Sequence, residues 1–108
     1  MTPDALAARA LSHLQRTPSD PALVEPVAGM LLLRHARPTS WTATVYQPVL
    51  CLILQGRKET AARDRSVALA PGDALVVSHD LPVVARIAQA APGQPYIAMI
   101  VALDLPLL

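Results

Sequence analysis

The segment from Val67 to Val83, with the sequence VALAPGDALVVSHDLPV, constrains the fold more than any other part of the chain. Two short apolar runs are separated by the tripeptide at residues 71–73, Pro-Gly-Asp, and the second run ends before Pro82. Proline fixes φ at about −65°, glycine supplies the positive φ that follows it, and aspartate bonds back to the local backbone. Apolar runs that are punctuated by such turns predict strands of an antiparallel sheet.

The N-terminal residues predict a short amphipathic helix. Thr2 suits the N-cap, Pro3 the first helical position, and Asp4 places a carboxylate in the first turn. Apolar residues recur on one face at helical spacing, namely Leu6, Ala7, Ala10, Leu11 and Leu14. The prolines between residues 18 and 26 push the backbone out of the helical region and predict a connector.

From Met30 onward the pattern changes to that of about seven short strands. We expect them at residues 30–37, 49–55, 57–62, 67–70, 74–78, 83–90 and 96–103, with a loop at 38–47. The segment at 49–55 is apolar on both faces and predicts a central strand, whereas Arg34 is expected to mark a solvent-facing side. The spacing predicts one all-β sandwich or jelly-roll barrel domain at residues 27–108, after a helix and connector at 1–26.

Composition excludes several classes of protein. The net charge of +1 lacks the basic excess of a nucleic-acid-binding chain. We find neither a signal peptide nor an apolar run long enough for a membrane helix, and the single Cys51 allows no internal disulfide. A soluble cytoplasmic protein is therefore expected. Its hydrophobic fraction of 53% also predicts apolar surface that contacts either a partner or a missing neighbouring segment.

Metal chemistry has only weak support. Barrel metal sites need three or four converging His, Asp or Glu side chains. His35 and His79 are candidates for the interior, with Asp80 or Glu59 as further ligands, but no pair of histidines is separated by one residue. We favour hydrogen-bonded, partly buried histidines and expect neither a metal ion nor a cofactor.

Nucleophilic catalysis is not predicted either. Ser78, His79 and Asp80 are consecutive, and neighbours on a strand point to opposite faces, so they do not form a catalytic triad. Cys51 has apolar neighbours on both sides, which raise the pKa of a thiol, so we interpret it as a core residue. No catalytic residue is assigned and we expect no enzyme.

Two further features leave alternatives open. The charged run at residues 57–65 either contacts phosphate or forms a solvated edge hairpin, and we favour the hairpin. Trp41 and Tyr46 either line the mouth of a ligand pocket or cover the core.

Four segments together resemble a known family, namely residues 48–58, 70–78, 81–83 and 95–96. Their order and spacing are similar to those of the N-terminal, cupin-like domain of AraC-type transcriptional regulators, over residues 27–105. The resemblance implies a double-stranded β-helix barrel that receives a small effector, followed by helices for dimerisation and two helix-turn-helix units. The chain ends at Leu108 without a helix-turn-helix pattern, so we expect a fragment or truncated product, which would reach DNA only through an absent C-terminal domain.

We therefore expect an effector-sensing, non-catalytic regulatory domain that forms a homodimer. A small metal-dependent cupin enzyme and a ligand-free dimerisation scaffold remain alternatives. The predicted ligand-binding residues are those assigned to the interior faces, with two aromatic residues at the rim: His35, Cys51, Ile53, Val77, His79 and Ile87, with Trp41 and Tyr46.

Overall fold

The computed structural model describes residues 2–103, which form one helix and nine strands. The helix α1 spans Pro3–Leu14, with Thr2 as its N-cap, as predicted. The strands are β1 (Ala22–Val27), β2 (Met30–His35), β3 (Thr42–Tyr46), β4 (Val49–Gln55), β5 (Arg57–Ala62), β6 (Arg65–Leu69), β7 (Ala74–Val77), β8 (Leu81–Gln89) and β9 (Tyr96–Ala102). The prediction of an all-β domain with a short N-terminal helix is confirmed.

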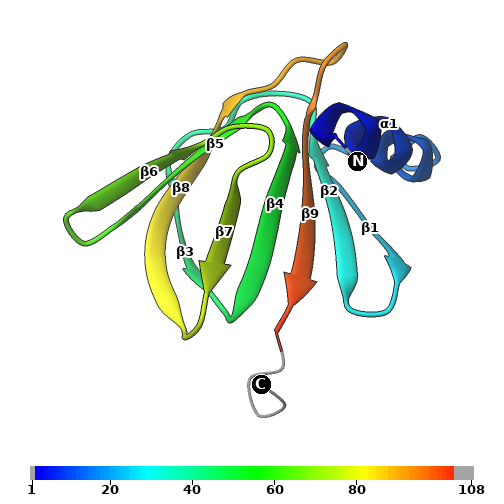
Figure 1. Ribbon diagram of the computed structural model, residues 1–108. Coiled ribbons are helices and arrows are strands. Elements are labelled where there is room, and N and C mark those ends of the chain that lie inside the picture. The colour runs from blue at the N-terminus through cyan, green and yellow to red at the C-terminus, as the bar shows by residue number, and fades with distance from the viewer. Residues whose placement is uncertain (1, 104–108) are drawn as a thin grey trace.

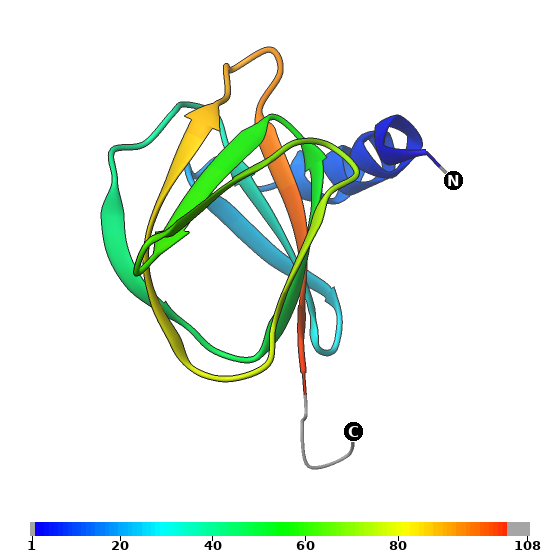
Figure 2. The same ribbon diagram turned by 60° about the vertical axis from the view of Figure 1, so that its left-hand side comes forward.

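The strands form two antiparallel sheets that curve around one interior (Figures 1 and 2). The five-stranded sheet has the order β1-β2-β9-β4-β7, and the four-stranded sheet has the order β3-β8-β5-β6. Because successive side chains of a strand point to opposite faces, each sheet has an inner face toward the interior and an outer face.

The segment from Val67 to Val83 crosses between the sheets twice. β6 and β8 belong to the four-stranded sheet, and β7 between them belongs to the five-stranded sheet. The first crossing is the predicted turn, in which the Asp73 amide donates to the Ala70 carbonyl (2.9 Å) and the Ala70 amide donates to the Asp73 carboxylate (2.9 Å). Gly72 has a φ of +93°, as this turn requires.

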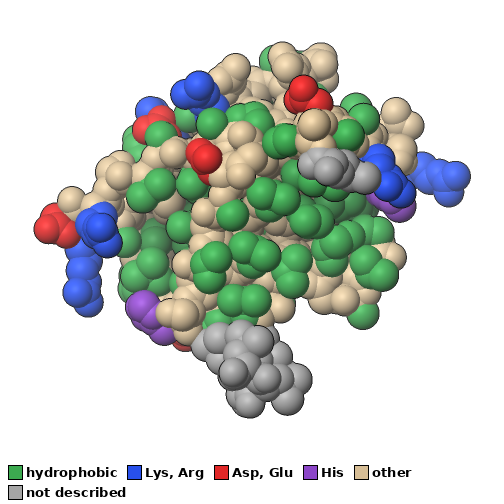
Figure 3. Space-filling model, viewed as in Figure 1, with side chains coloured by type: hydrophobic (Ala, Val, Ile, Leu, Met, Phe, Trp, Pro, Cys, Tyr) green, Lys and Arg blue, Asp and Glu red, His purple; other side chains and the backbone are tan. Residues whose placement is uncertain are grey.

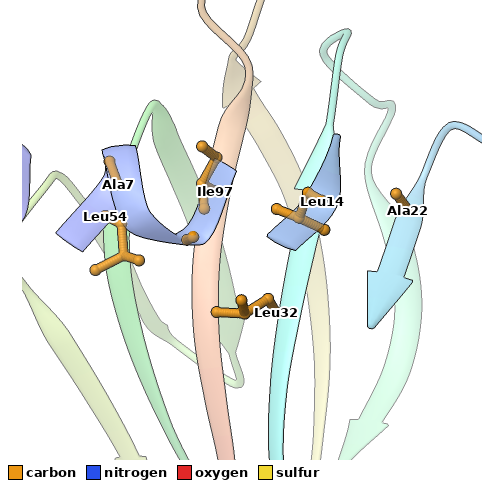
Figure 4. Close-up of a cluster of buried hydrophobic side chains, with 7 residues drawn as sticks. Ala7, Leu14, Ala22, Leu32, Leu54 and Ile97 are labelled. Atoms are coloured by element: carbon orange, nitrogen blue, oxygen red, sulfur yellow. The ribbon is translucent and has the colours of Figure 1, made fainter. Parts of the chain in front are cut away.

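The helix α1 packs on the outer face of the five-stranded sheet (Figures 1 and 4). Ala7, Ala10 and Leu14 contact the sheet in one buried cluster. Arg34, which we expected to face solvent, lies beneath the end of the helix, and its guanidinium donates to the carbonyls of Leu14 (3.1 Å), Thr17 (2.7 Å) and Ser19 (2.9 Å). The prediction for Arg34 is only partly correct: the side chain is half-buried, because a helix end offers unpaired carbonyls that an arginine satisfies.

Two strands, β1 and β3, were not predicted from the sequence. β1 lies in the predicted connector and pairs with β2, and β3 lies in the predicted loop and pairs with β8. Both are edge strands of their sheets, and most of their residues are exposed, so neither contains the run of buried apolar residues that marks a central strand. Within residues 2–103, no helix is long and apolar enough to cross a membrane.

Candidate functional site

The interior between the sheets is partly filled by apolar side chains. Six buried residues form its core: Cys51, Ile53, Leu69, Ile87, Tyr96 and Ala98. β9 lies at the centre of the five-stranded sheet, and its alternation places Tyr96 and Ala98 in this core while Ile97 packs beneath α1.

Two cavities extend from this core. The first has a volume of about 320 Å³ and a mostly apolar lining that includes Leu31, Val49, Cys51 and Ile100. The second has a volume of about 880 Å³ and reaches the exposed turn between β5 and β6. Tyr46 and Leu75 line both cavities, so the two spaces adjoin.

β5 contributes polar side chains to these cavities. Its residues alternate between the faces of the four-stranded sheet, which places Lys58 in the lining of the first cavity and Thr60 in that of the second. Glu59, between them, lies on the outer face, where it accepts a bond from Arg86 at 2.7 Å.

The expectation of a solvated edge hairpin at residues 57–65 is therefore only partly correct. β6 is an edge strand, but β5 lies between β6 and β8. The sequence does not single out Lys58 and Thr60, because a run of charges is typical of a solvated face. The alternation of Lys58, Thr60 and Ala62 was the signal in the sequence that placed them on one face.

Lys58 lies over the ring of Tyr46, with Nζ 4.9 Å from the ring centroid. Such a cation–π contact stabilises an ammonium group without neutralising it. Among the residues from 2 to 103, the pair of Arg86 and Glu59 is the only salt bridge, so Lys58 has no carboxylate partner there.

Three hydroxyl groups inside the barrel are buried and have no hydrogen-bond partner within the described part of the chain: those of Tyr46, Thr60 and Tyr96. We call them the interior hydroxyls. Buried polar groups are nearly always bonded, and leaving one unbonded costs about 1–3 kcal/mol. Tyr46 and Thr60 belong to residues that line the cavities, whereas Tyr96 lines neither. Two unbonded hydroxyls at the cavity walls indicate a surface prepared for a polar molecule.

Burial keeps two titratable groups of the interior core, Tyr96 and Cys51, uncharged. Burial raises the pKa of Tyr96 above its usual range, and the neighbouring Cys51 and Tyr46 add to the effect. Burial also raises the pKa of the Cys51 thiol, against the charge of Lys58 and a contact with Tyr96, as expected for a core cysteine.

His35 is half-buried, with its ring centroid 6.1 Å from that of Tyr96. Burial lowers the pKa of His35; the charge of Asp20 opposes this shift and the charge of Lys58 adds to it. The imidazole is therefore neutral at pH 7.

The structure brings part of the predicted site together. Tyr46 and Cys51 line the first cavity, and Tyr46 and His79 line the second. Ile53, Val77 and Ile87 are buried residues, and Ile53 and Ile87 belong to the interior core. Ligand binding by any of them stays a prediction.

Trp41 lies apart from the two cavities. It is 45% exposed, and its ring stacks with the guanidinium of Arg86 at 4.8 Å from the centroid. Arg86 is bonded to Glu59 on the outer face of the four-stranded sheet, which places Trp41 outside the barrel. The expectation of Trp41 near the pocket rim does not hold, because the aromatic ring covers an arginine instead.

The described residues contain no group of three or more His, Cys, Asp or Glu side chains placed to hold a metal ion. His35 contacts Tyr96, whereas His79 is exposed and lies beside Ser78 at 3.3 Å. The donor set of a metal-binding barrel is thus not assembled in residues 2–103.

The outer face of the five-stranded sheet carries apolar side chains below the helix (Figure 3). One cross-strand row is formed by Met30, Val101, Leu50 and Val76, which are neighbours in the register of β2, β9, β4 and β7. Val76 is 64% exposed. The apolar surface predicted from composition lies at least partly here.

Comparison of the sequence with protein families gives one match. Residues 26–108 match the model of the AraC-type transcriptional regulator N-terminus. None of the curated proteins matches the chain.

Solved structures with the same fold share little sequence. A cupin-2 domain protein from Shewanella frigidimarina is 13% identical, over 86% of this chain and 91% of that chain, with a TM-score of 0.56. A cupin superfamily protein from Desulfitobacterium hafniense is 24% identical, over 77% and 75%, with a TM-score of 0.53. The CENP-C cupin domain of Drosophila melanogaster is 14% identical, over 90% and 95%, with a TM-score of 0.52.

These neighbours establish a cupin-like fold. The family match covers most of the chain and agrees with the resemblance of residues 48–58 and 70–78. The chain therefore belongs to the family of N-terminal domains of AraC-type transcriptional regulators.

Proposed function

We propose that this domain senses a small-molecule effector that binds inside the barrel, without catalysing a reaction. The observation that carries the proposal is the pair of adjoining cavities, about 320 and 880 Å³, with the unbonded hydroxyls of Tyr46 and Thr60 in their lining residues. Ligand sites are typically concave and mostly apolar, with a few polar groups that fix the orientation of the ligand. Family membership supports a regulatory role rather than an enzymatic one.

The effector acts by differential affinity. A molecule that bridges the two sheets favours the barrel conformation in which both inner faces contact it, and so shifts the population toward that state. In a complete regulator this shift changes the pose of an attached DNA-binding half. Homodimer formation, DNA contact through that half and a cytoplasmic location belong to the same proposal.

A thermal-shift screen of metabolites tests the proposal. A compound present at about a hundred times its dissociation constant stabilises a protein by about 2.7 kcal/mol, which corresponds to about 10 °C in Tm for a domain of this size. We expect at least one compound to do this. If a broad screen gives no stabilisation, and a crystal structure shows a collapsed interior, the sensing role is excluded.

A metal-dependent cupin enzyme is the first alternative. Such an enzyme retains about one metal ion per chain after purification, and replacing a ligand releases the ion. Metal analysis of the wild type, of His35→Ala and of His79→Ala separates the two functions. We expect no stoichiometric metal in any of the three.

A ligand-free dimerisation scaffold is the second alternative, and the apolar row on the outer sheet face favours it. Mass measurement in solution reports the dimer, and the screen reports the ligand. A dimer that binds no compound supports the scaffold, whereas a dimer that binds one supports the proposal.

A further inference from the structure

The interior polar groups differ in what they offer a ligand. Lys58 supplies a positive charge, and within the described part of the chain no carboxylate balances it. The interior hydroxyls are buried, with Tyr96 fully inaccessible and Thr60 6% exposed. Tyr46 and Thr60 line the cavities and can each donate a hydrogen bond to a ligand, whereas Tyr96 lines neither cavity.

These donors lie close to one another on the chain. Lys58 and Thr60 are two residues apart on the inner face of β5, about 7 Å along the strand. Tyr46 lies under the Lys58 ammonium and lines both cavities. One small anionic group can therefore meet a cation and at least one hydroxyl donor here.

The charge and the lining limit the ligand further. Lys58 is the only charged side chain among the residues that line the first cavity. Lys58 is partly buried, and a partly desolvated charge is stabilised by a charge that balances it, so this one cation matches one negative charge better than the two charges of a phosphate monoester. The remaining lining residues are mostly apolar, which fits a hydrocarbon body.

We propose that the barrel binds a small monocarboxylate with an apolar body, its carboxylate placed against Lys58 and the hydroxyls of Tyr46 and Thr60. This inference rests on the proposed sensing function and adds the chemical class of the effector. Arg63 and Arg65 line the second cavity beside Asp64, so its outer end also carries a net positive charge. An anion approaching through that cavity is attracted at long range.

Calorimetric titration with matched pairs of acids and neutral amides tests the proposal. The probes are octanoate with octanamide, and benzoate with benzamide, at one pH and ionic strength. We expect at least one acid to bind about ten-fold or more tightly than its amide, because a hydrogen bond between charged groups is stronger than a neutral one.

Two variants on β5 assign the difference to one side chain. Lys58→Met keeps the length of the side chain and removes its charge, and it should erase the preference for the acid without changing the affinity of the amide. Arg57→Met is the control, since Arg57 is exposed and does not line the two interior cavities. It should bind the acid as tightly as the wild type does.

The possible outcomes separate this inference from the sensing function. Equal affinity for acid and amide, or a preference that survives Lys58→Met, overturns the carboxylate assignment. If neutral metabolites stabilise the protein in the thermal-shift screen while no acid binds, the assignment fails and sensing stands. If neither class binds, both fail.

Discussion

Lys58 holds its ammonium group 4.9 Å from the centre of the Tyr46 ring, inside the barrel. The contact joins β5 to the end of β3 across β8, and both residues line the first cavity. A ring face attracts the cation but leaves its N–H donors available. Together with the interior hydroxyls, the pair forms a polar patch in an otherwise apolar interior. Unpaired polar groups there favour binding of a polar ligand and lower the stability of the ligand-free fold.

The hydroxyl of Thr60 should destabilise the ligand-free protein. Thr60→Val removes a buried oxygen that lacks a partner among residues 2–103 and keeps the shape of the side chain. We expect the free energy of unfolding to rise by about 1 kcal/mol. Urea denaturation measures it, with Thr44→Val on exposed β3 as the control, for which we expect little change. An unchanged or lower stability of Thr60→Val would show that its hydroxyl is satisfied.

Gly56 lets the backbone of Tyr96 come close, and an alanine there should be poorly tolerated. Gly56 has a φ of +79°, and an added Cβ would lie 2.5 Å from the Gln89 carbonyl oxygen and 2.9 Å from Tyr96 Cα. Both atoms belong to the backbone, so neither moves easily. We expect Gly56→Ala to cost about 3 kcal/mol, from left-handed strain and overpacking together.

Gly29 provides the matched control for Gly56. It has a φ of +83°, but an added Cβ meets no atom within 4 Å. Gly29→Ala should therefore lower the free energy of unfolding only through left-handed backbone strain, by about 1 kcal/mol, in the same urea experiment. Equal losses of stability for Gly56→Ala and Gly29→Ala would mean that the close approach of Gly56 to Tyr96 adds nothing to the destabilisation.

His35 should make stability depend on pH. Burial is the main cause of its lowered pKa in the folded state, whereas the unfolded chain titrates at about 6.5. Below that pH the unfolded state binds a proton that the folded state binds less readily, so stability falls as the pH decreases from about 7 toward 5. Denaturation at several pH values should give a flatter profile for His35→Gln.

The exposed His79 is the control for this profile. His79→Gln should keep the pH dependence of the wild type. If His35→Gln retains the same slope as the wild type, the loss of stability at low pH comes from other groups.

The sequence predicted the faces of several strands because alternation is a local property. Cys51 and Ile53 on β4, and Ile87 on β8, belong to the interior core as their positions indicated. The turn at residues 71–73 was also predictable, because its glycine and aspartate make the local bond and the positive φ that the turn needs. The sheet that each flanking strand joins could not be predicted, since it depends on pairing with strands that are distant in sequence.

The polar part of the candidate site was less predictable. Charges in the run at 57–65 are usually solvated, and only the position of β5 between two other strands brings Lys58 inside. Trp41 is of a residue type that often lines ligand pockets. Its ring instead lies over Arg86, 45 residues away in sequence, on the outer face of the four-stranded sheet. The edge strands β1 and β3 could not be predicted as strands, because their side chains are mostly exposed and form no buried apolar run.

The most direct test of effector sensing is the stoichiometry of binding to a barrel whose cavities are blocked. Leu75 lines both cavities, and the adjacent Val76 points outward from the same strand. Titration of the best stabilising compound should give one molecule per chain for the wild type and for Val76→Trp. Leu75→Trp should bind none while its circular dichroism spectrum is unchanged. A folded Leu75→Trp protein that binds the compound as tightly as the wild type would contradict an effector site inside the barrel.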